Sequence, residues 1–149
     1  MTPLSLSCFD LGRLPRGIAL AFCGLVVSSC SDGPTAPNPA DYQNVDWRLV
    51  TLQRPDSTIV SAPAGVTLTA RFDDDGTLAV RADCNSCRAR YTLSGAALSV
   101  SPMACTLIAC PSAPLDGEYA RILSTATALE MEGSNLALRS PEGTLRFRR

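Results

Sequence analysis

The chain has 149 residues, 46% of them hydrophobic, and a formal net charge of -1 at pH 7. The numbers of basic and acidic residues are nearly equal, so the chain has neither the excess positive charge that binds nucleic acid nor a strongly acidic tail. The sequence contains no histidine, which excludes Ser-His-Asp and Cys-His catalysis and the usual catalytic zinc sites.

The first 29 residues have the regions of a secretory signal peptide. Arg13 and Arg16 form a basic region, and residues 17–27 form an apolar core that is too short to span a bilayer, which needs about 20 apolar residues. The stretch Val27-Ser28-Ser29-Cys30 resembles the bacterial lipobox, in which the cysteine is acylated and becomes the mature N-terminus. We therefore predict a lipoprotein signal peptide over residues 1–29 and lipidation at Cys30.

The segment that follows Cys30 is rich in proline and polar residues, which favour an extended chain. Residues 30–44 are predicted to be a lipid-anchored tether. In the bacterial lipoprotein sorting that this sequence resembles, a serine after the lipidated cysteine, here Ser31, favours the outer membrane of a Gram-negative cell. The predicted location is therefore the cell envelope, on the periplasmic face of the outer membrane. The alternative is an ordinary signal peptide cleaved near Ala36 or Ala40, with Cys30 incidental.

Residues 45–149 are predicted to form one domain. From Trp47 onward, apolar and polar residues alternate, and turn residues interrupt the pattern about every ten positions, which indicates antiparallel strands joined by hairpins. The predicted strands are residues 47–52, 66–72, 77–82, 90–93, 97–101, 128–132, 135–139 and 144–148. The segment Asp73-Asp74-Asp75-Gly76 is predicted to be a solvated hairpin tip, because it lacks the later glutamate and flanking helices of a calcium-binding EF-hand.

One helix interrupts the strands and is predicted from Ala113 to about Ala126, with Ser112 as its N-cap and Pro114 in its first turn. Its apolar stripe comprises Leu115, Tyr119, Ile122, Leu123 and Ala126. Such a helix can cover the open end or one face of a curved sheet.

Four of the seven cysteines lie in the domain, at Cys84, Cys87, Cys105 and Cys110. An even number in an exported chain predicts two disulfides, and the spacing alone permits three pairings. The alternative is a four-cysteine zinc site, which the Cys-x2-Cys and Cys-x4-Cys spacings approach, but an oxidising compartment consumes the thiolates that zinc requires. We predict no metal and no other cofactor.

A series of short motifs spans the domain in a definite order. They are Trp47-x-Leu49, Leu68-x-x-x-Phe72 followed by Asp-Asp-Gly and Thr77-Leu78, Cys84-Asn85 with Tyr91, Leu98-x-Val100, Met103-Ala104-Cys105, Leu115-Asp116-x-x-Tyr119-x-x-x-Leu123, Leu136-x-Leu138 and Leu145-x-Phe147. In this order the domain resembles the META, or HslJ-like, family of exported bacterial proteins. The resemblance covers essentially residues 45–149.

The resemblance implies a mainly β (α+β) fold, a small antiparallel barrel-like sheet with one packed helix, in agreement with the strand pattern. The family pattern more often carries two cysteines, which implies a bond between Cys84 and Cys105 and hence one between Cys87 and Cys110. Members are associated with heat-shock response, envelope stress, drug tolerance and, in some parasites, virulence. No enzymatic reaction is implied.

The chain has no catalytic base and no paired carboxylates at a catalytic spacing, so we predict that it is not an enzyme. We predict that the protein supports envelope integrity, or stress and drug tolerance, by binding an envelope protein. It is expected to be a lipid-anchored monomer with no nucleic-acid partner. The alternative is an inhibitor of an extracellular hydrolase, such as lysozyme or a protease, that inserts a rigid loop. The candidate binding loop comprises Asn85, Ser86, Arg88 and Arg90, because disulfides lower the ordering cost of binding.

Overall fold

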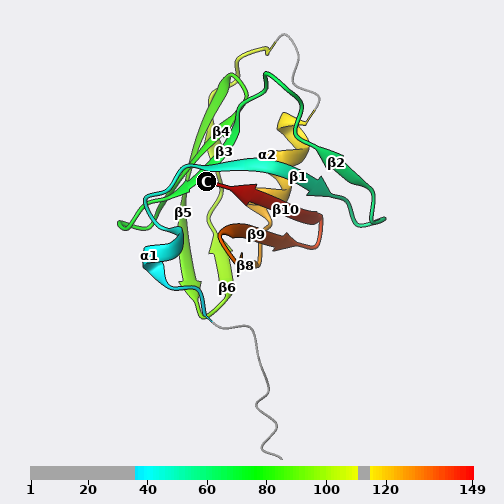
Figure 1. Ribbon diagram of the computed structural model, residues 1–149. Helices are drawn as coiled ribbons and strands as arrows, with labels where there is room; N and C mark the ends of the chain where they lie inside the picture. Colours follow the sequence, from blue (N-terminus) through cyan, green and yellow to red (C-terminus); the bar gives the residue numbers. More distant parts are fainter. Residues whose placement is uncertain (1–35, 111–114) are drawn as a thin grey trace, which may run out of the picture. The chain divides into compact units, whose positions relative to one another are not determined.

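A computed structural model describes residues 36–110 and 115–149 of the chain (Figure 1). The two helices are α1 (Pro39–Tyr42) and α2 (Asp116–Ser124). The strands are β1 (Trp47–Gln53), β2 (Ile59–Ser61), β3 (Leu68–Phe72), β4 (Thr77–Ala82), β5 (Asn85–Ser94), β6 (Ala97–Val100), β7 (Ala104–Cys105), β8 (Ala128–Glu132), β9 (Asn135–Ser140) and β10 (Gly143–Arg148). Neither helix has the length and apolar composition needed to cross a membrane.

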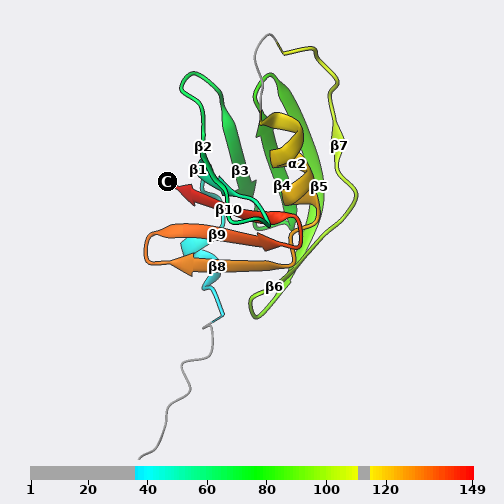
Figure 2. The same ribbon diagram turned by 90° about the vertical axis from the view of Figure 1, so that its right-hand side faces the viewer.

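Eight of the strands form a closed antiparallel barrel. The sheet follows the order β10-β9-β8-β6-β5-β4-β3-β1, and the pairing of β1 with β10 closes it. Strands β2 and β7 lie outside this circuit, because β2 adds to β1 and β7 adds to β5. Figure 2 shows these two strands on different sides of the barrel. The fold class predicted from the sequence is confirmed.

Strand β1 changes register once because it contains a β-bulge. Leu49 pairs with Phe147, whereas Thr51 pairs with Arg146, so Val50 is the extra residue on β1. A bulge bends a strand and increases its twist. On either side of the bend, β1 pairs with a different strand. Its first two residues pair with β3, and its last three pair with β2.

Helix α1 belongs to the folded domain, which corrects the predicted tether over residues 30–44. The Asn38 side chain caps the helix by accepting a hydrogen bond from Ala40 N (3.0 Å). Tyr42 is buried, and its ring packs edge-on against Phe72 at 6.0 Å between centroids. The Trp47 indole donates to the carbonyl of Tyr42 (2.9 Å). These contacts bury part of a segment that its prolines had suggested would be extended.

Helix α2 is the packed helix, although it begins later than the sequence suggested. It runs from Asp116 to Ser124 with Leu115 at its N-cap, and the predicted cap Ser112 and Pro114 lie outside the described residues. Its apolar side packs against β10, β4 and β9. The Tyr119 ring is fully buried, and burial raises the pKa of its hydroxyl well above the ordinary value.

The interior of the barrel is filled by large apolar side chains. Those with less than 2% of their surface exposed are Trp47, Tyr119, Phe72, Phe147, Leu52, Leu68, Leu78, Ile122, Leu123, Leu129, Leu136 and Leu138. No charged or polar residue is buried among the residues that the structure describes. Apart from the buried Tyr119 hydroxyl, the described groups that could carry chemistry therefore lie on the outside of the barrel.

The predicted strands all occur, with small shifts at their ends. The largest difference is β5, which begins at Asn85 rather than at residue 90. Strands β2 and β7 were not predicted, and both are short additions at the edge of the barrel circuit. The segment from Asp73 to Gly76 forms the predicted hairpin tip, closed by hydrogen bonds from Asp73 N to Thr77 O (2.8 Å) and from Gly76 N to Asp73 O (3.1 Å).

Candidate functional site

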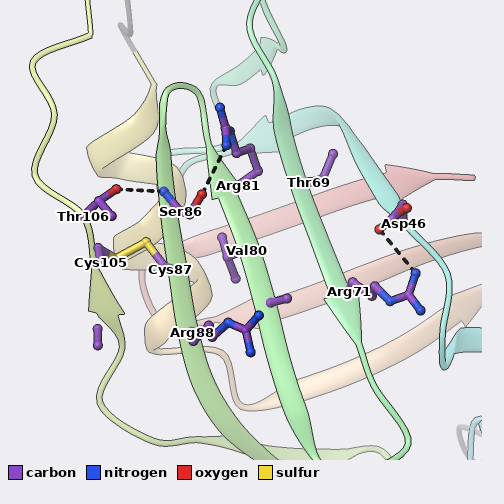
Figure 3. Close-up of a pocket in the computed structure, with 12 residues that line it drawn as sticks. Asp46, Thr69, Arg71, Val80, Arg81, Ser86, Cys87, Arg88, Cys105 and Thr106 are labelled. Atoms are coloured by element: carbon purple, nitrogen blue, oxygen red, sulfur yellow. Dashed lines mark hydrogen bonds and ion pairs between the residues drawn. A yellow bond between two sulfur atoms is a disulfide. The ribbon is translucent and has the colours of Figure 1, made fainter.

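A groove of about 590 Å³ lies on the outer face of β3, β4 and β5, with β7 along one side (Figure 3). Side chains on a strand alternate between the two faces of the sheet, so residues two apart share the outer face. Outward positions along these strands carry arginine or a small residue: Thr69, Arg71, Ala79, Arg81, Ser86 and Arg88. The small residues leave space between the arginines, which produces the groove.

Strand pairing sets the arrangement of the three arginines. Arg71 pairs with Ala79, and Ala79 pairs with Arg88, so two arginines flank one alanine in a row across three strands. Arg81 lies two residues further along β4, in the next row, where it pairs with Ser86. We call Arg71, Arg81, Arg88 and the intervening Ala79 the arginine groove.

Two of these arginines are held by neighbouring groups. Arg71 Nε donates to Asp73 Oδ1 (2.7 Å), and this hydrogen bond raises the pKa of Arg71. Arg71 Nη1 lies 3.9 Å from Asp46 Oδ1, at the opposite side of the groove from β7. Arg81 Nε donates to the carbonyl of Asp83 (2.6 Å) and its Nη1 donates to Ser86 Oγ (3.2 Å). Within residues 36–110 and 115–149, Arg81 has no carboxylate partner.

Two disulfides join the start of β5 to β7 and the loop after it. Cys87 is bonded to Cys105, and Cys84 is bonded to Cys110. The pairing implied by the family resemblance, Cys84 with Cys105 and Cys87 with Cys110, is wrong. Strand register explains the difference: Cys87 and Cys105 are directly opposite each other on β5 and β7. The chain then continues past the end of β7, which brings Cys110 to Cys84 before the start of β5.

The four predicted cysteines therefore form the two predicted bridges. The carboxylate of Asp83 and the sulfurs of Cys84 and Cys110 lie within 4.8 Å of one another. Because these sulfurs are bonded to each other, neither is a thiolate that could bind zinc.

The segment from Thr106 to Cys110, which we call the stapled loop, is fixed at both ends. A disulfide lies just before it at Cys105 and another at its last residue, Cys110. Between them the side chain of Asn85 binds the main chain of Ile108: Nδ2 donates to Ile108 O (3.0 Å) and Oδ1 accepts from Ile108 N (2.7 Å). The loop is thus tied to β5 at three places.

The stapled loop presents apolar side chains to solvent. Leu107 is 97% exposed and Ile108 is 57% exposed, although both are large aliphatic residues. The two side chains are adjacent in sequence and lie on a loop whose backbone is held by disulfides and by Asn85. The loop is continuous with the groove, because Cys105 and Thr106 line one side of it.

The predicted binding loop is a strand rather than a loop, because Asn85 to Arg90 all lie in β5. Its residues have different roles. Asn85 holds the stapled loop, and Ser86 N donates to Thr106 Oγ1 (3.0 Å). Arg88 lines the groove, and Arg90 Nη2 donates to the carbonyl of Asp75 (2.7 Å) at the hairpin tip. Only Ser86 and Arg88 of this set line the groove.

Three residues of the arginine groove were not predicted from the sequence: Ala79, Arg71 and Arg81. The apolar tip of the stapled loop was not predicted either. The alternation in Thr69-x-Arg71 and Ala79-x-Arg81 was a signal for the groove, since it places arginines and small residues on one face. Cys30, the predicted lipidation site, lies outside the described residues.

The geometry defines a small β-barrel domain stapled by disulfides, with a basic groove and an apolar loop on its outer surface. The chain belongs to the META domain family, whose model matches residues 40–149. The match begins within α1, in agreement with the burial of Tyr42. No curated protein matches the chain.

Two solved structures share this fold. The NMR structure of a protein from Burkholderia xenovorans is 22% identical, with a TM-score of 0.62, and the match covers 93% of this chain and 98% of that one. A second NMR structure is 17% identical, with a TM-score of 0.58, and the match covers 75% of this chain and 94% of that one. At these identities the likeness establishes the fold alone.

Proposed function

We propose that this chain is a non-enzymatic, lipid-anchored protein of the cell envelope that supports envelope integrity or stress and drug tolerance by binding an envelope protein. The observation that carries the proposal is the stapled loop, in which Leu107 is 97% exposed next to two disulfides. A loop that is already ordered loses little conformational entropy on binding, so its apolar side chains contribute more of their burial energy to affinity. The predicted anchor at Cys30 supports the location.

The partner expected for this loop is a protein with an apolar pocket. Leu107 and Ile108 are adjacent in sequence and protrude from a narrow loop, so they suit insertion into a concave surface more than contact with a flat one. The domain is expected to act as a monomer that carries this loop on the end of its tether.

Site-specific photocrosslinking in cells tests the proposed contact. A photoreactive amino acid at position 107 is expected to give a discrete adduct with one envelope protein. The same residue at position 59 is the matched control, since Ile59 is also an exposed aliphatic residue (61%) but lies on β2, away from the stapled loop (Figure 2). Equal crosslinking at both positions would count against a specific contact.

Complementation tests the physiological role. A strain that lacks the protein is expected to show raised envelope permeability and reduced survival of envelope stress, restored by the wild-type chain and by Ile59→Ser but not by Leu107→Ser/Ile108→Ser. Replacement of Cys30 by Ser is expected to release the protein from the membrane fraction. An unchanged deletion strain would remove the basis for the proposed role.

Inhibition of an extracellular hydrolase is the second candidate, and the two disulfides that flank the stapled loop favour it. Rigid loops of this kind can occupy an enzyme cleft at low entropic cost. The inhibitory segment would then be the stapled loop rather than Asn85 to Arg90. The purified protein should slow at least one enzyme of a panel of muralytic and proteolytic hydrolases, and Leu107→Ser should abolish that effect.

A further inference from the structure

We propose that the arginine groove binds a phosphate group, carried either by a soluble ligand or by a lipid headgroup. The site comprises Arg71, Arg81 and Arg88, whose positions on β3, β4 and β5 lie next to Ala79 in the strand register and which all line the groove. It is separate from the apolar tip of the stapled loop and does not depend on a protein partner for that loop.

The first argument is electrostatic. Arg81 and Arg88 are diagonal neighbours on adjacent strands, because Arg81 pairs with Ser86 and Arg88 lies two residues further along β5. Diagonal neighbours on a sheet have their strand positions about 7–8 Å apart, so Arg81 and Arg88 place two like charges in the same groove, where they repel each other. Neither arginine forms an ion pair with a carboxylate among the described residues. An anion bound between them would relieve this repulsion.

Several arginines elsewhere on the barrel are paired with carboxylates instead. Arg54 pairs with Glu118, Arg121 with Glu142, and Arg139 with Glu130. In the groove, the only carboxylates paired with an arginine are those of Asp46 and Asp73 at Arg71, as far as the described residues show. Arg81 and Arg88 therefore have no carboxylate counterion within residues 36–110 and 115–149.

The second argument is the supply of hydrogen-bond donors. Arg88 makes no hydrogen bond through its side chain to any described residue, and Figure 3 shows it extending from β5 over β4. The Nη2 groups of Arg71 and Arg81 likewise make no hydrogen bond within the described part of the chain, while their other nitrogens are held by Asp73, Asp83 and Ser86. Two of the guanidinium groups are thus oriented and still have donors to offer.

The third argument concerns the shape of the ligand. A planar carboxylate is satisfied by one guanidinium fork, whereas a tetrahedral phosphate has oxygens that can accept from arginines on several sides. Ala79 provides the space for such a group, because its methyl side chain lies between Arg71 and Arg88. The groove is open along its length, which accommodates a phosphate attached to a larger molecule.

The test uses the purified full-length chain with Cys30 replaced by Ser, which carries no lipid and needs no detergent, and two phosphate sources. In the first arm, sodium phosphate is titrated at constant ionic strength while the amide NMR signals of Ala79 and Arg88 are followed. In the second, sedimentation with vesicles of phosphatidylglycerol and phosphatidylcholine is compared with sedimentation with phosphatidylcholine alone. Saturable binding of inorganic phosphate supports a soluble source, and selective sedimentation with the anionic vesicles supports a headgroup.

Three variants decide whether the groove is responsible. Arg88→Gln removes one of the two groove guanidinium groups that form no ion pair among the described residues, and it is expected to weaken binding about tenfold, as the loss of one charge-assisted contact implies. Ala79→Glu places a carboxylate between the arginines and is expected to abolish binding while raising the melting temperature. Arg148→Gln is the matched control, an exposed arginine on β10 outside the groove, and should bind as the wild type does.

Leu107→Ser should also leave phosphate binding unchanged, which separates this inference from the proposed role of the stapled loop. The inference is overturned if neither phosphate source binds, or if Arg148→Gln weakens binding as much as Arg88→Gln does. The second result would identify a general attraction to positive charge rather than a built site. Arg88→Gln alters only an exposed side chain, so its result stands even if Ala79→Glu fails to fold.

Discussion

The side chain of Asn85 binds both main-chain polar groups of Ile108: its Nδ2 donates to Ile108 O (3.0 Å), and its Oδ1 accepts from Ile108 N (2.7 Å). The side-chain amide thereby makes the two hydrogen bonds that a neighbouring strand would make. Ile108 lies beyond the end of β7, so no strand makes them there. Oδ1 of Asn85 also accepts from Thr106 Oγ1 (3.0 Å). One residue of β5 therefore fixes the loop that carries the exposed Leu107.

Replacement of Asn85 by Ala should loosen the stapled loop without unfolding the barrel. The change removes hydrogen bonds that are partly exposed, so we expect a loss of about 1 kcal/mol in the free energy of unfolding. The Ile108 amide should exchange with solvent at least tenfold faster, because its acceptor is gone. Hydrogen exchange followed by NMR measures this directly.

Asn85→Asp is the matched variant for this prediction. It keeps the acceptor for Ile108 N but removes the donor to Ile108 O, so exchange at Ile108 should stay closer to the wild-type rate than in Asn85→Ala. If Ile108 exchanges equally slowly in all three proteins, the disulfides alone hold the loop and the Asn85 clamp has no role.

The disulfide pairing predicts which cysteine substitutions leave free thiols. Among the four cysteines of the two bridges, Cys84→Ser/Cys110→Ser and Cys87→Ser/Cys105→Ser should each retain one bridge and no free thiol. Cys84→Ser/Cys105→Ser should instead leave two thiols without their native partners. Each bridge lies close to the other along the chain, so the loss of one should cost about 2.5 kcal/mol by loop closure. Thiol alkylation with mass spectrometry and denaturant unfolding measure both effects.

The substituted proteins are needed because a trypsin digest cannot distinguish the pairings. Arg81 and Arg88 bound one peptide that contains Cys84 and Cys87, while Arg90 and Arg121 bound another that contains Cys105 and Cys110. Either pairing joins the same two peptides. Free thiols in both of the native-pair variants, with none in Cys84→Ser/Cys105→Ser, would establish the opposite connectivity.

The sequence was sufficient to predict the barrel because its strands are half-buried and alternate clearly. In β10, Leu145 and Phe147 face the core while Arg146 and Arg148 face outward, and β3 and β4 follow the same rule. The start of helix α2 was placed too early because Ser112 and Pro114 are good residues for a first turn, but the helix begins at Asp116. The conformational preferences of individual residues were enough to predict that a helix is present but not where it begins.

The candidate site was less predictable, because it depends on contacts between distant segments. The first half of β5 contains an asparagine, a serine and a cysteine, which resemble a loop when considered alone, and only pairing with β4 and β7 makes that segment a strand. The same pairing determines the disulfides. The arginine groove needs the register of three strands, which periodicity alone does not supply.

Among the glycines that the structure describes, Gly143 should be the least tolerant of alanine. Its φ is +142°, and an added Cβ would overlap the carbonyl oxygen of Gln53 and approach Ile122 Cδ1 at 3.2 Å. Strained backbone and steric overlap together predict a loss of about 3 kcal/mol in the free energy of unfolding for Gly143→Ala. Thermal and denaturant unfolding measure the loss.

Gly117 provides the control for that substitution. It lies in α2, has no positive φ, and an added Cβ would meet nothing within 4 Å. Gly117→Ala should therefore leave stability unchanged or raise it by up to about 1 kcal/mol, since alanine favours a helix. If Gly143→Ala and Gly117→Ala changed the free energy of unfolding equally, that result would contradict the close approach of β10 to Gln53.

The ion pair between Arg54 and Glu118 should make stability depend on pH. Arg54 Nε and Nη2 donate to the two carboxylate oxygens of Glu118 at 2.8 and 2.9 Å, joining the end of β1 to α2. This hydrogen bonding lowers the pKa of Glu118 below its ordinary value of 4.5. A carboxyl whose pKa is lower in the folded state stabilises the protein above its unfolded pKa, and the effect is lost as pH falls through the folded value.

We therefore expect Glu118→Gln to be less stable than the wild type at neutral pH, with a difference that stays constant down to about pH 5 and then shrinks toward zero in more acidic solution. Urea unfolding at a series of pH values between 2 and 7 measures it, and added salt should reduce it because the pair is partly exposed. In an Arg54→Gln background the same substitution should produce little pH-dependent difference. A difference that widened as the pH fell would contradict the sign of the Glu118 pKa shift.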